Sequence, residues 1–125
     1  MRGSREQCAD DEIYIYLLLV FYVNSINMKE HNYYIYILTN HRKNVLYIGV
    51  TNNLVERVKQ HKEKTAPGFT QKYNVNHLVY YEQYRQISEA IYREKILKKW
   101  RREWKENIIN EFNPTWKDLF NELIA

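Results

Sequence analysis

Apolar and aromatic residues gather in three short runs in the middle of the chain. Residues 33–39, 45–50 and 78–84 are rich in Tyr, Ile, Val and Leu, which is typical of β-strands. The polar residues 40–44 (NHRKN) lie between the first two runs and have the composition of a hairpin loop. The pattern therefore predicts three strands, of which the first two form an antiparallel hairpin.

The apolar positions of the hairpin also predict its register. Side chains alternate between the two faces of a strand, so the core face should hold Ile35, Ile37, Leu46 and Ile48. We therefore expect residue 35 to pair with residue 48, and residue 37 with residue 46. This pairing puts Tyr36 opposite Tyr47 on the other face, where the two phenols come together.

A short helix is predicted directly after the hairpin. Thr51-Asn52-Asn53 supplies N-cap residues for a helix over about residues 54–62. Arg57 and His61 are four residues apart on this helix and therefore lie on one face. Pro67-Gly68 breaks the pattern beyond it.

A longer helix is predicted after the third strand. Ser88 is expected to cap this helix, which should run to about Trp104. Asn113-Pro114 marks the next boundary, because the residue before a proline disfavours helical geometry. Residues 116–123 have the pattern of a short amphipathic ending.

Glu94 is the chemical anomaly of the longer helix. At about 100° per residue, the apolar face of the helix combines Ile87, Ala90, Ile91, Leu97, Trp100 and Trp104. Glu94 projects from the middle of this face, and a buried carboxylate needs a paired cation or a bound metal. Two explanations stay open: a salt bridge to an arginine such as Arg57 or Arg101, or a metal ion.

The opposite side of the same helix is basic. It carries Lys95, Lys98, Lys99 and Arg102. Such a run is usually a solvated face, and the alternative is a surface that follows a phosphate backbone.

Residues 1–27 differ from the remainder of the chain. They carry a net charge of −2, from 2 Arg against 4 Asp and Glu, and contain an apolar run of 11 residues at 13–23 (IYIYLLLVFYV). A bilayer span needs about 20 apolar residues, and acidic residues precede the run, so neither a transmembrane helix nor a signal peptide is expected. We expect an N-terminal extension over residues 1–27, which packs on the domain or mediates self-association, and a functional unit over residues 28–125.

Charge and cysteine usage narrow the class of protein. The 125 residues fit one domain, and residues 28–125 hold 17 Lys and Arg against 11 Asp and Glu, a net charge of +6. A basic domain of this kind favours phosphate-bearing partners such as nucleic acid. Cys8 is the single cysteine, so it cannot form an internal disulfide, and this usage fits a reducing cytoplasm.

Two tyrosine triplets give the chain a family resemblance. Tyr34-Ile35-Tyr36 is followed after ten residues by Tyr47-Ile48-Gly49, which resembles the paired signature of the GIY-YIG nuclease superfamily. The resemblance runs from about residue 32 to residue 121, and its further positions are Arg57, His61, Glu94 and Asn113. It looks closest to the small single-domain branch of endonucleases, which is related to the nuclease domain of an excision-repair incision enzyme. Tyr34 stands where the signature has its first glycine, but the catalytic position of that triplet is Tyr36.

The resemblance implies a fold and a metal cofactor. The expected fold is α/β (α+β), with a small central three-stranded antiparallel sheet flanked by helices. Glu94 would be the single protein ligand of Mg²⁺ or Mn²⁺, which suits a magnesium ion that keeps most of its waters. Asn113 would orient Glu94 or the backbone near the metal.

The resemblance also implies a role for each of the remaining site residues. Tyr47 would be the general base that deprotonates the attacking water, and Tyr36 would orient that water or Tyr47. Arg57 would stabilise a phenolate and bind phosphate oxygens. His61 would relay the proton from Tyr47 or hold a phosphate.

These roles imply a divalent-metal-dependent endonuclease that hydrolyses phosphodiester bonds in DNA, in DNA repair or processing. The alternative is a non-catalytic nucleic-acid-binding or partner-recruiting module with the same fold. A third interpretation, an interaction protein anchored by its apolar segment, rests only on residues 13–23. The oligomeric state stays open between a monomer and a weak dimer.

Overall fold

The computed structural model describes residues 15, 17–19, 32–66 and 68–125. Within them, a three-stranded antiparallel sheet has the strand order β2-β1-β3. The strands are β1 (Tyr33–Thr39), β2 (Leu46–Thr51) and β3 (His77–Tyr84). The predicted α+β fold with a small antiparallel sheet flanked by helices is confirmed.

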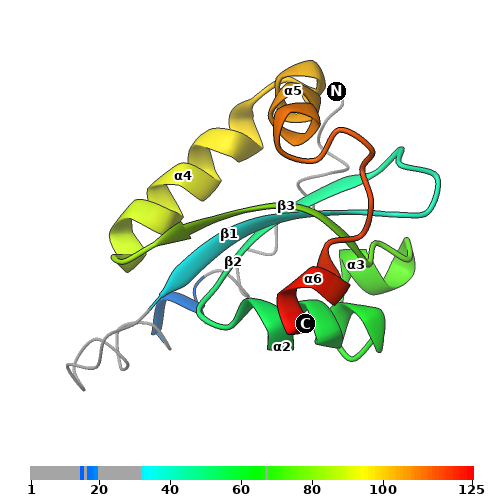
Figure 1. Ribbon diagram of the computed structural model, residues 1–125. Coiled ribbons are helices and arrows are strands. Elements are labelled where there is room, and N and C mark those ends of the chain that lie inside the picture. The colour runs from blue at the N-terminus through cyan, green and yellow to red at the C-terminus, as the bar shows by residue number, and fades with distance from the viewer. Residues whose placement is uncertain (1–14, 16, 20–31, 67) are drawn as a thin grey trace.

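Helices cover both faces of this sheet, which makes a three-layer structure (Figure 1). On one face lie α4 (Ile87–Lys99) and α5 (Arg102–Phe112), and on the other lie α2 (Leu54–Lys62), α3 (Phe69–Lys72) and α6 (Phe120–Ile124). Each interface has its own apolar core. Ile35, Ile37 and Ile48 pack toward α4 and α5, whereas Tyr36 and Leu38 pack toward α2 and α3.

The hairpin register is shifted by two residues from the predicted one. Residue 36 pairs with Gly49 and residue 38 with Tyr47, whereas the prediction paired residue 36 with residue 47. The loop explains the shift, because Val45 belongs to it: Asn40 Oδ1 accepts from the Val45 amide at 3.3 Å, and Thr39 Oγ1 donates to the Val45 carbonyl at 2.7 Å. A shift of two residues preserves the alternation of faces, so Tyr36 and Tyr47 still share a face.

The single long helix predicted from Ser88 to Trp104 is wrong. The chain forms α4 and α5 instead, and Gln86 rather than Ser88 is the N-cap residue of α4. Trp100 and Arg101 are extended between the two helices, with ψ near 149° and 155°. The turn lets Ile109 of α5 join the core that holds Ala90 and Leu97 of α4.

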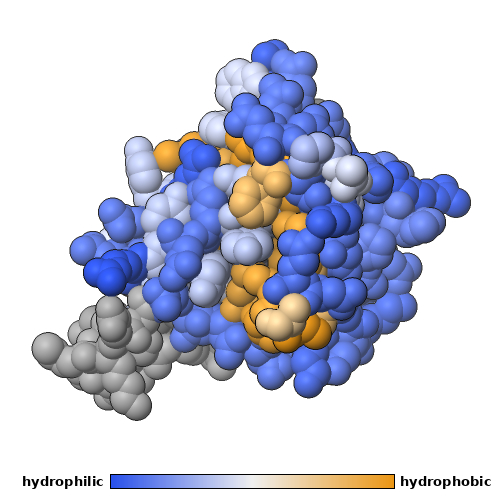
Figure 2. Space-filling view, in the orientation of Figure 1, coloured by the Kyte–Doolittle hydropathy of each residue, from blue (hydrophilic) through white to orange (hydrophobic). Residues whose placement is uncertain are grey.

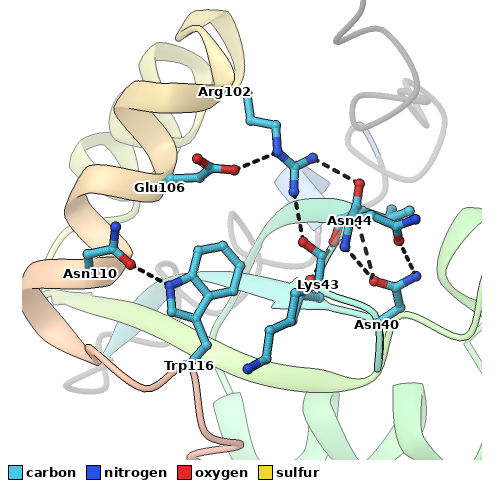
Figure 3. A network of polar contacts seen from close by, with 9 residues as sticks. Asn40, Lys43, Asn44, Arg102, Glu106, Asn110 and Trp116 are labelled. Carbon is cyan, nitrogen blue, oxygen red and sulfur yellow. Dashed lines mark hydrogen bonds and ion pairs between the residues drawn. The ribbon is translucent and has the colours of Figure 1, made fainter.

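Arg102, predicted to lie on a solvated basic face, instead joins α5 to the hairpin loop (Figure 3). Its guanidinium donates to the carbonyl oxygens of Asn44 and Lys43 at 3.0 and 3.1 Å, and to Glu106 Oε2 at 2.9 Å. The same region holds a hydrogen bond from the Trp116 indole to Asn110 Oδ1. These contacts fix the loop that determines the hairpin register.

The C-terminal segment closes the α2 side of the sheet. The Leu119 amide donates to the Leu78 carbonyl at 2.8 Å, and Asp118 Oδ1 accepts from the Leu78 amide at 3.1 Å. The amphipathic ending predicted over residues 116–123 therefore becomes helical only at α6. Figure 2 shows a mostly hydrophilic surface with an apolar strip over α6, where Ile124 is 55% exposed.

The predicted division at residues 27 and 28 lies outside the described residues. Of the apolar run 13–23, residues 15 and 17–19 are described, and they are helical. Leu17 packs against the core beneath α4 and α5. Among the helices that the structure describes, none is long and apolar enough to cross a membrane.

Candidate active site

The site begins at Tyr36, in the middle of the central strand. Tyr36 is 1% exposed, and its ring lies across Gly49 of the neighbouring strand. A Cβ atom at Gly49 would lie 2.5 Å from Tyr36 Cζ and Oη, which is closer than side-chain atoms can approach. The glycine of the Tyr47-Ile48-Gly49 triplet is therefore a steric requirement for the position of Tyr36.

The helix α2 brings two nitrogen atoms to the Tyr36 hydroxyl. Asn53 caps this helix by accepting from the Glu56 amide at 3.1 Å, as its sequence predicted. Arg57 Nε donates to Tyr36 Oη at 3.4 Å, and His61 Nε2 lies 3.1 Å from the same oxygen. The prediction that Arg57 and His61 share a face is confirmed, and that face meets Tyr36.

Thr70 completes this network and is the residue that sequence reasoning missed. Its Oγ1 lies 2.8 Å from His61 Nδ1, and its side chain is 3% exposed. Thr70 belongs to the four-residue α3, which follows Gly68 in a positive-φ conformation (φ 96°). The segment Pro67-Gly68-Phe69-Thr70 resembles the family that the tyrosine triplets suggest, and this likeness could have drawn attention to Thr70. No periodicity connects Thr70 to His61.

Burial makes His61 a neutral imidazole. Desolvation, followed by the neighbouring Arg57 charge, lowers the pKa of His61 to about 3. A neutral imidazole has one N–H donor and one acceptor nitrogen, so it connects the hydroxyls of Tyr36 and Thr70 in one polarised chain. In one tautomer, the Tyr36 hydroxyl donates to Nε2 and Nδ1–H donates to Thr70 Oγ1. In the other, Thr70 Oγ1 donates to Nδ1 and Nε2–H donates to Tyr36 Oη, and the distances fit both.

Tyr47 lies beside this network and is more open to solvent. Its ring centroid is 6.3 Å from that of Tyr36 and 5.7 Å from that of His61. Arg57 interacts with both phenols. Burial is the largest single effect on the pKa of Arg57 and lowers it, but the combined effects of Tyr36 and Tyr47 are greater, so this pKa is raised overall. Tyr47 is half-buried, whereas Tyr36 is fully buried. Of the two phenols, Tyr47 is therefore the one that water can reach.

Burial also sets the chemistry of Tyr36. Desolvation raises the pKa of Tyr36 above its ordinary value, the Arg57 charge opposes this effect, and the charge of Glu94 adds to it. Tyr36 therefore stays protonated at neutral pH and acts as a hydrogen-bonding group rather than as a base.

Glu94 lies on the opposite face of the sheet from α2. It lies on α4, is 2% exposed as predicted, and its carboxylate is near enough to raise the pKa of Tyr36. Its partner differs from both arginines proposed from the sequence: Lys98 Nζ lies 2.7 Å from Glu94 Oε2. The prediction that Lys98 lies on the opposite side of the helix is wrong, because residues four apart are neighbours on one face of a helix. Burial raises the pKa of Glu94, and Lys98 opposes this shift.

Asn113 makes its described hydrogen bonds away from Glu94. Its Nδ2 donates to the carbonyl oxygens of Val79 at 3.2 Å and Lys117 at 2.8 Å, and its Oδ1 accepts from the Lys117 amide. These contacts join the end of α5 to β3. A direct role of Asn113 toward Glu94 stays a prediction.

The donor set restricts how a metal could be held. In the described part of the chain, no three His, Cys, Asp or Glu residues lie together, as they would in a metal site formed by protein side chains alone. Glu94 fits a hard cation that keeps most of its water, because one carboxylate can then suffice together with substrate phosphate. A cation bound only by protein atoms, as in a structural zinc site, does not fit these residues.

Comparisons with known proteins give a family match and a similar solved structure. A family model of the GIY-YIG catalytic domain matches residues 32–107. Curated proteins give no match. Among solved structures, the solution NMR structure of a UPF0213 protein from Bacillus halodurans is 26% identical, with a TM-score of 0.42, over 63% of this chain and 83% of that one.

Proposed function

We propose that this chain, which belongs to the GIY-YIG catalytic domain family, is a divalent-metal-dependent endonuclease that hydrolyses phosphodiester bonds in DNA. The family is one of nucleases. The observation that carries the proposal is the convergence of Arg57 and His61 on the buried Tyr36 hydroxyl, beside the half-buried Tyr47.

Tyr47 is the proposed general base. A base must touch the attacking water, and of the two tyrosines only Tyr47 is partly open to solvent. A phenol has an ordinary pKa of about 10, so the neighbouring cation Arg57 is needed to favour the phenolate. Tyr36 and His61 then orient Arg57 and Tyr47 rather than accept the proton.

Arg57 is proposed to serve the phosphate as well. Two nitrogens of its guanidinium are bound, with Nε on Tyr36 and Nη1 on Gln60 Oε1 at 3.0 Å. These bonds fix the plane of the guanidinium, and a fixed donor can stabilise the charge that develops on the phosphate oxygens without reorganising.

Glu94 is proposed to hold Mg²⁺ or Mn²⁺. When bound, such an ion stabilises charge on the phosphate and helps the leaving oxygen to depart. The contribution of the chain itself is to keep one carboxylate buried on the rigid helix α4, within electrostatic range of Tyr36.

The test is metal-dependent nicking of supercoiled DNA by the purified full chain. We expect cleavage with Mg²⁺ or Mn²⁺ and none with EDTA, and we expect Tyr47→Phe and Glu94→Gln each to lower the rate by about 10²–10⁴-fold. Glu103→Gln is the matched control, because Glu103 is an exposed glutamate on α5 paired only with the exposed Arg101 among the described contacts. Equal rates for Glu94→Gln and the unchanged chain would reject the proposed mechanism.

The net charge of +6 over residues 28–125 favours one competing function, a nucleic-acid-binding module without catalysis. Salt-sensitive DNA binding with no cleavage, over several metals and DNA structures, would select that function instead.

A further inference from the structure

The ion pair between Glu94 and Lys98 has two unequal members. The Glu94 side chain is 3% exposed, whereas the Lys98 side chain is 25% exposed. Lys98 can therefore leave the pair for water, but Glu94 cannot. Both residues lie on α4 at an i,i+4 spacing with the glutamate first, which is the favourable order for a helix pair.

A divalent cation and the Lys98 ammonium would compete for the same carboxylate. Lys98 Nζ is already 2.7 Å from Glu94 Oε2. A metal ion bound to Oε2 at about 2.1 Å would lie within about 5 Å of Nζ, where a double and a single positive charge repel each other. The buried carboxylate also needs a cation at all times, because an unpaired buried charge is strongly disfavoured.

We propose that Lys98 is an exchangeable internal cation. Its ammonium neutralises Glu94 until a divalent cation binds, and binding of that cation displaces the ammonium into solvent. The inference rests on the proposed role of Glu94 as the metal ligand. It adds a positioning residue to the site: Lys98 occupies the carboxylate until the metal arrives, and by this competition it lowers how tightly the metal binds.

The competition makes a quantitative prediction for metal affinity. If the pair is formed for about nine-tenths of the time, it lowers the apparent affinity about tenfold. Lys98→Gln should therefore bind Mn²⁺ about tenfold more tightly than the unchanged chain. Lys98→Arg keeps a cation that can bind the carboxylate through two hydrogen bonds, so it should bind Mn²⁺ more weakly.

The experiment is a titration of the full chain with Mn²⁺, with free Mn²⁺ measured by electron paramagnetic resonance. Lys95→Gln is the matched control. Lys95 is an exposed residue of the same helix that acts on Glu94 by its charge alone, so its removal should change the affinity much less than removal of Lys98. Equal Mn²⁺ affinities for Lys98→Gln and the unchanged chain would overturn the inference, and so would weaker binding by Lys98→Gln.

Glu94→Gln separates this inference from the proposed function. If Glu94→Gln binds Mn²⁺ as tightly as the unchanged chain, Glu94 is not the ligand and the proposed metal site fails. If Glu94→Gln loses binding while Lys98→Gln binds normally, only the exchange fails.

A second measurement needs no substitution at the pair and so does not depend on how a variant folds. In the unchanged chain with ¹³Cε-labelled lysine, addition of Mg²⁺ should move the Lys98 signal as its ammonium enters water. A Lys98 signal that stays constant at saturating Mg²⁺ would show a fixed structural bridge and overturn the exchange.

Discussion

At the scale of single residues, burial changes the chemistry of the site more than residue type does. His61 and Tyr36 are ordinary titratable side chains in the sequence, but the structure keeps both neutral, because burial lowers the pKa of His61 to about 3 and raises that of Tyr36. The site thus has a permanent cation in Arg57 and neutral hydrogen-bonding partners around it. In the proposed mechanism, Tyr47 is then the group that changes its charge.

The neutral state of His61 predicts how stability depends on pH. The pKa of His61 is lowered on folding, from about 6.5 in the unfolded chain, so the unfolded state binds the proton first as the pH falls. The contribution of neutral His61 to the free energy of unfolding is present above about pH 6.5 and is lost as the pH falls toward 3. Between pH 6.5 and 5 we expect a loss of about 2 kcal/mol in the free energy of unfolding, at 1.36 kcal/mol per pH unit.

Urea unfolding at each pH measures this effect, with His61→Gln as the control. The variant lacks the titrating group, so its stability should vary less over the same interval. Equal pH dependence in both proteins would show that His61 is not the residue responsible.

The sequence predicted only part of the site at this scale. The four-residue spacing of Arg57 and His61 predicted a shared face, because helix geometry is local. The contact of Thr70 with His61 joins two helices separated by Pro67-Gly68, so it does not follow from periodicity. The contact of Lys98 with Glu94 has the same four-residue spacing as Arg57 and His61 and could have been predicted, but Lys98 was placed on the opposite side of the helix.

At the scale of elements, the hairpin register places the buried tyrosine. Pairing of Tyr36 with Gly49 gives the ring a surface without a side chain to lie on. In the predicted register, Tyr36 would have met the side chain of Tyr47 directly. The observed register depends on the loop over residues 40–45, which Asn40, Thr39 and Arg102 hold in place.

Gly49→Ala should therefore destabilise the protein and displace Tyr36. The new methyl group would lie 2.5 Å from the Tyr36 ring in the present structure, and overpacking of this kind typically costs about 1–3 kcal/mol. In a Tyr36→Val background the methyl group has space, so Gly49→Ala should cost much less there. A double-mutant cycle by urea unfolding measures the coupling, and purely additive effects would contradict the steric explanation.

At the scale of the whole molecule, the proposed site draws residues from both layers that the sheet separates. Arg57 and His61 come from α2 on one side, and Glu94 comes from α4 on the other (Figure 1). The basic charge is carried by residues 28–125 as a whole, so DNA binding is expected to be an electrostatic property of the domain.

Binding should therefore weaken steeply with salt. With Glu94→Gln in EDTA, which prevents cleavage, we expect the affinity for duplex DNA to fall on the order of tenfold or more between 50 and 200 mM salt, as it does when several phosphates are contacted. Fluorescence anisotropy with a labelled duplex measures this change. An affinity that does not depend on salt would contradict phosphate contacts as the main source of binding.

The sequence by itself determined the features that depend on local pattern: three strands, the α2 helix with its Asn53 cap, the shared face of Arg57 and His61, and the burial of Glu94. These follow from alternation, capping and helical spacing, which act over a few residues. The pairing of Glu94 with Lys98 also follows the local four-residue spacing of a helix, although Lys98 was expected on the opposite side. The tertiary structure alone decided the hairpin register, the turn between α4 and α5 and the contact of Thr70 with His61. Each of these depends on contacts between residues that lie far apart in the sequence. Such contacts form only when the sheet and its helices pack together.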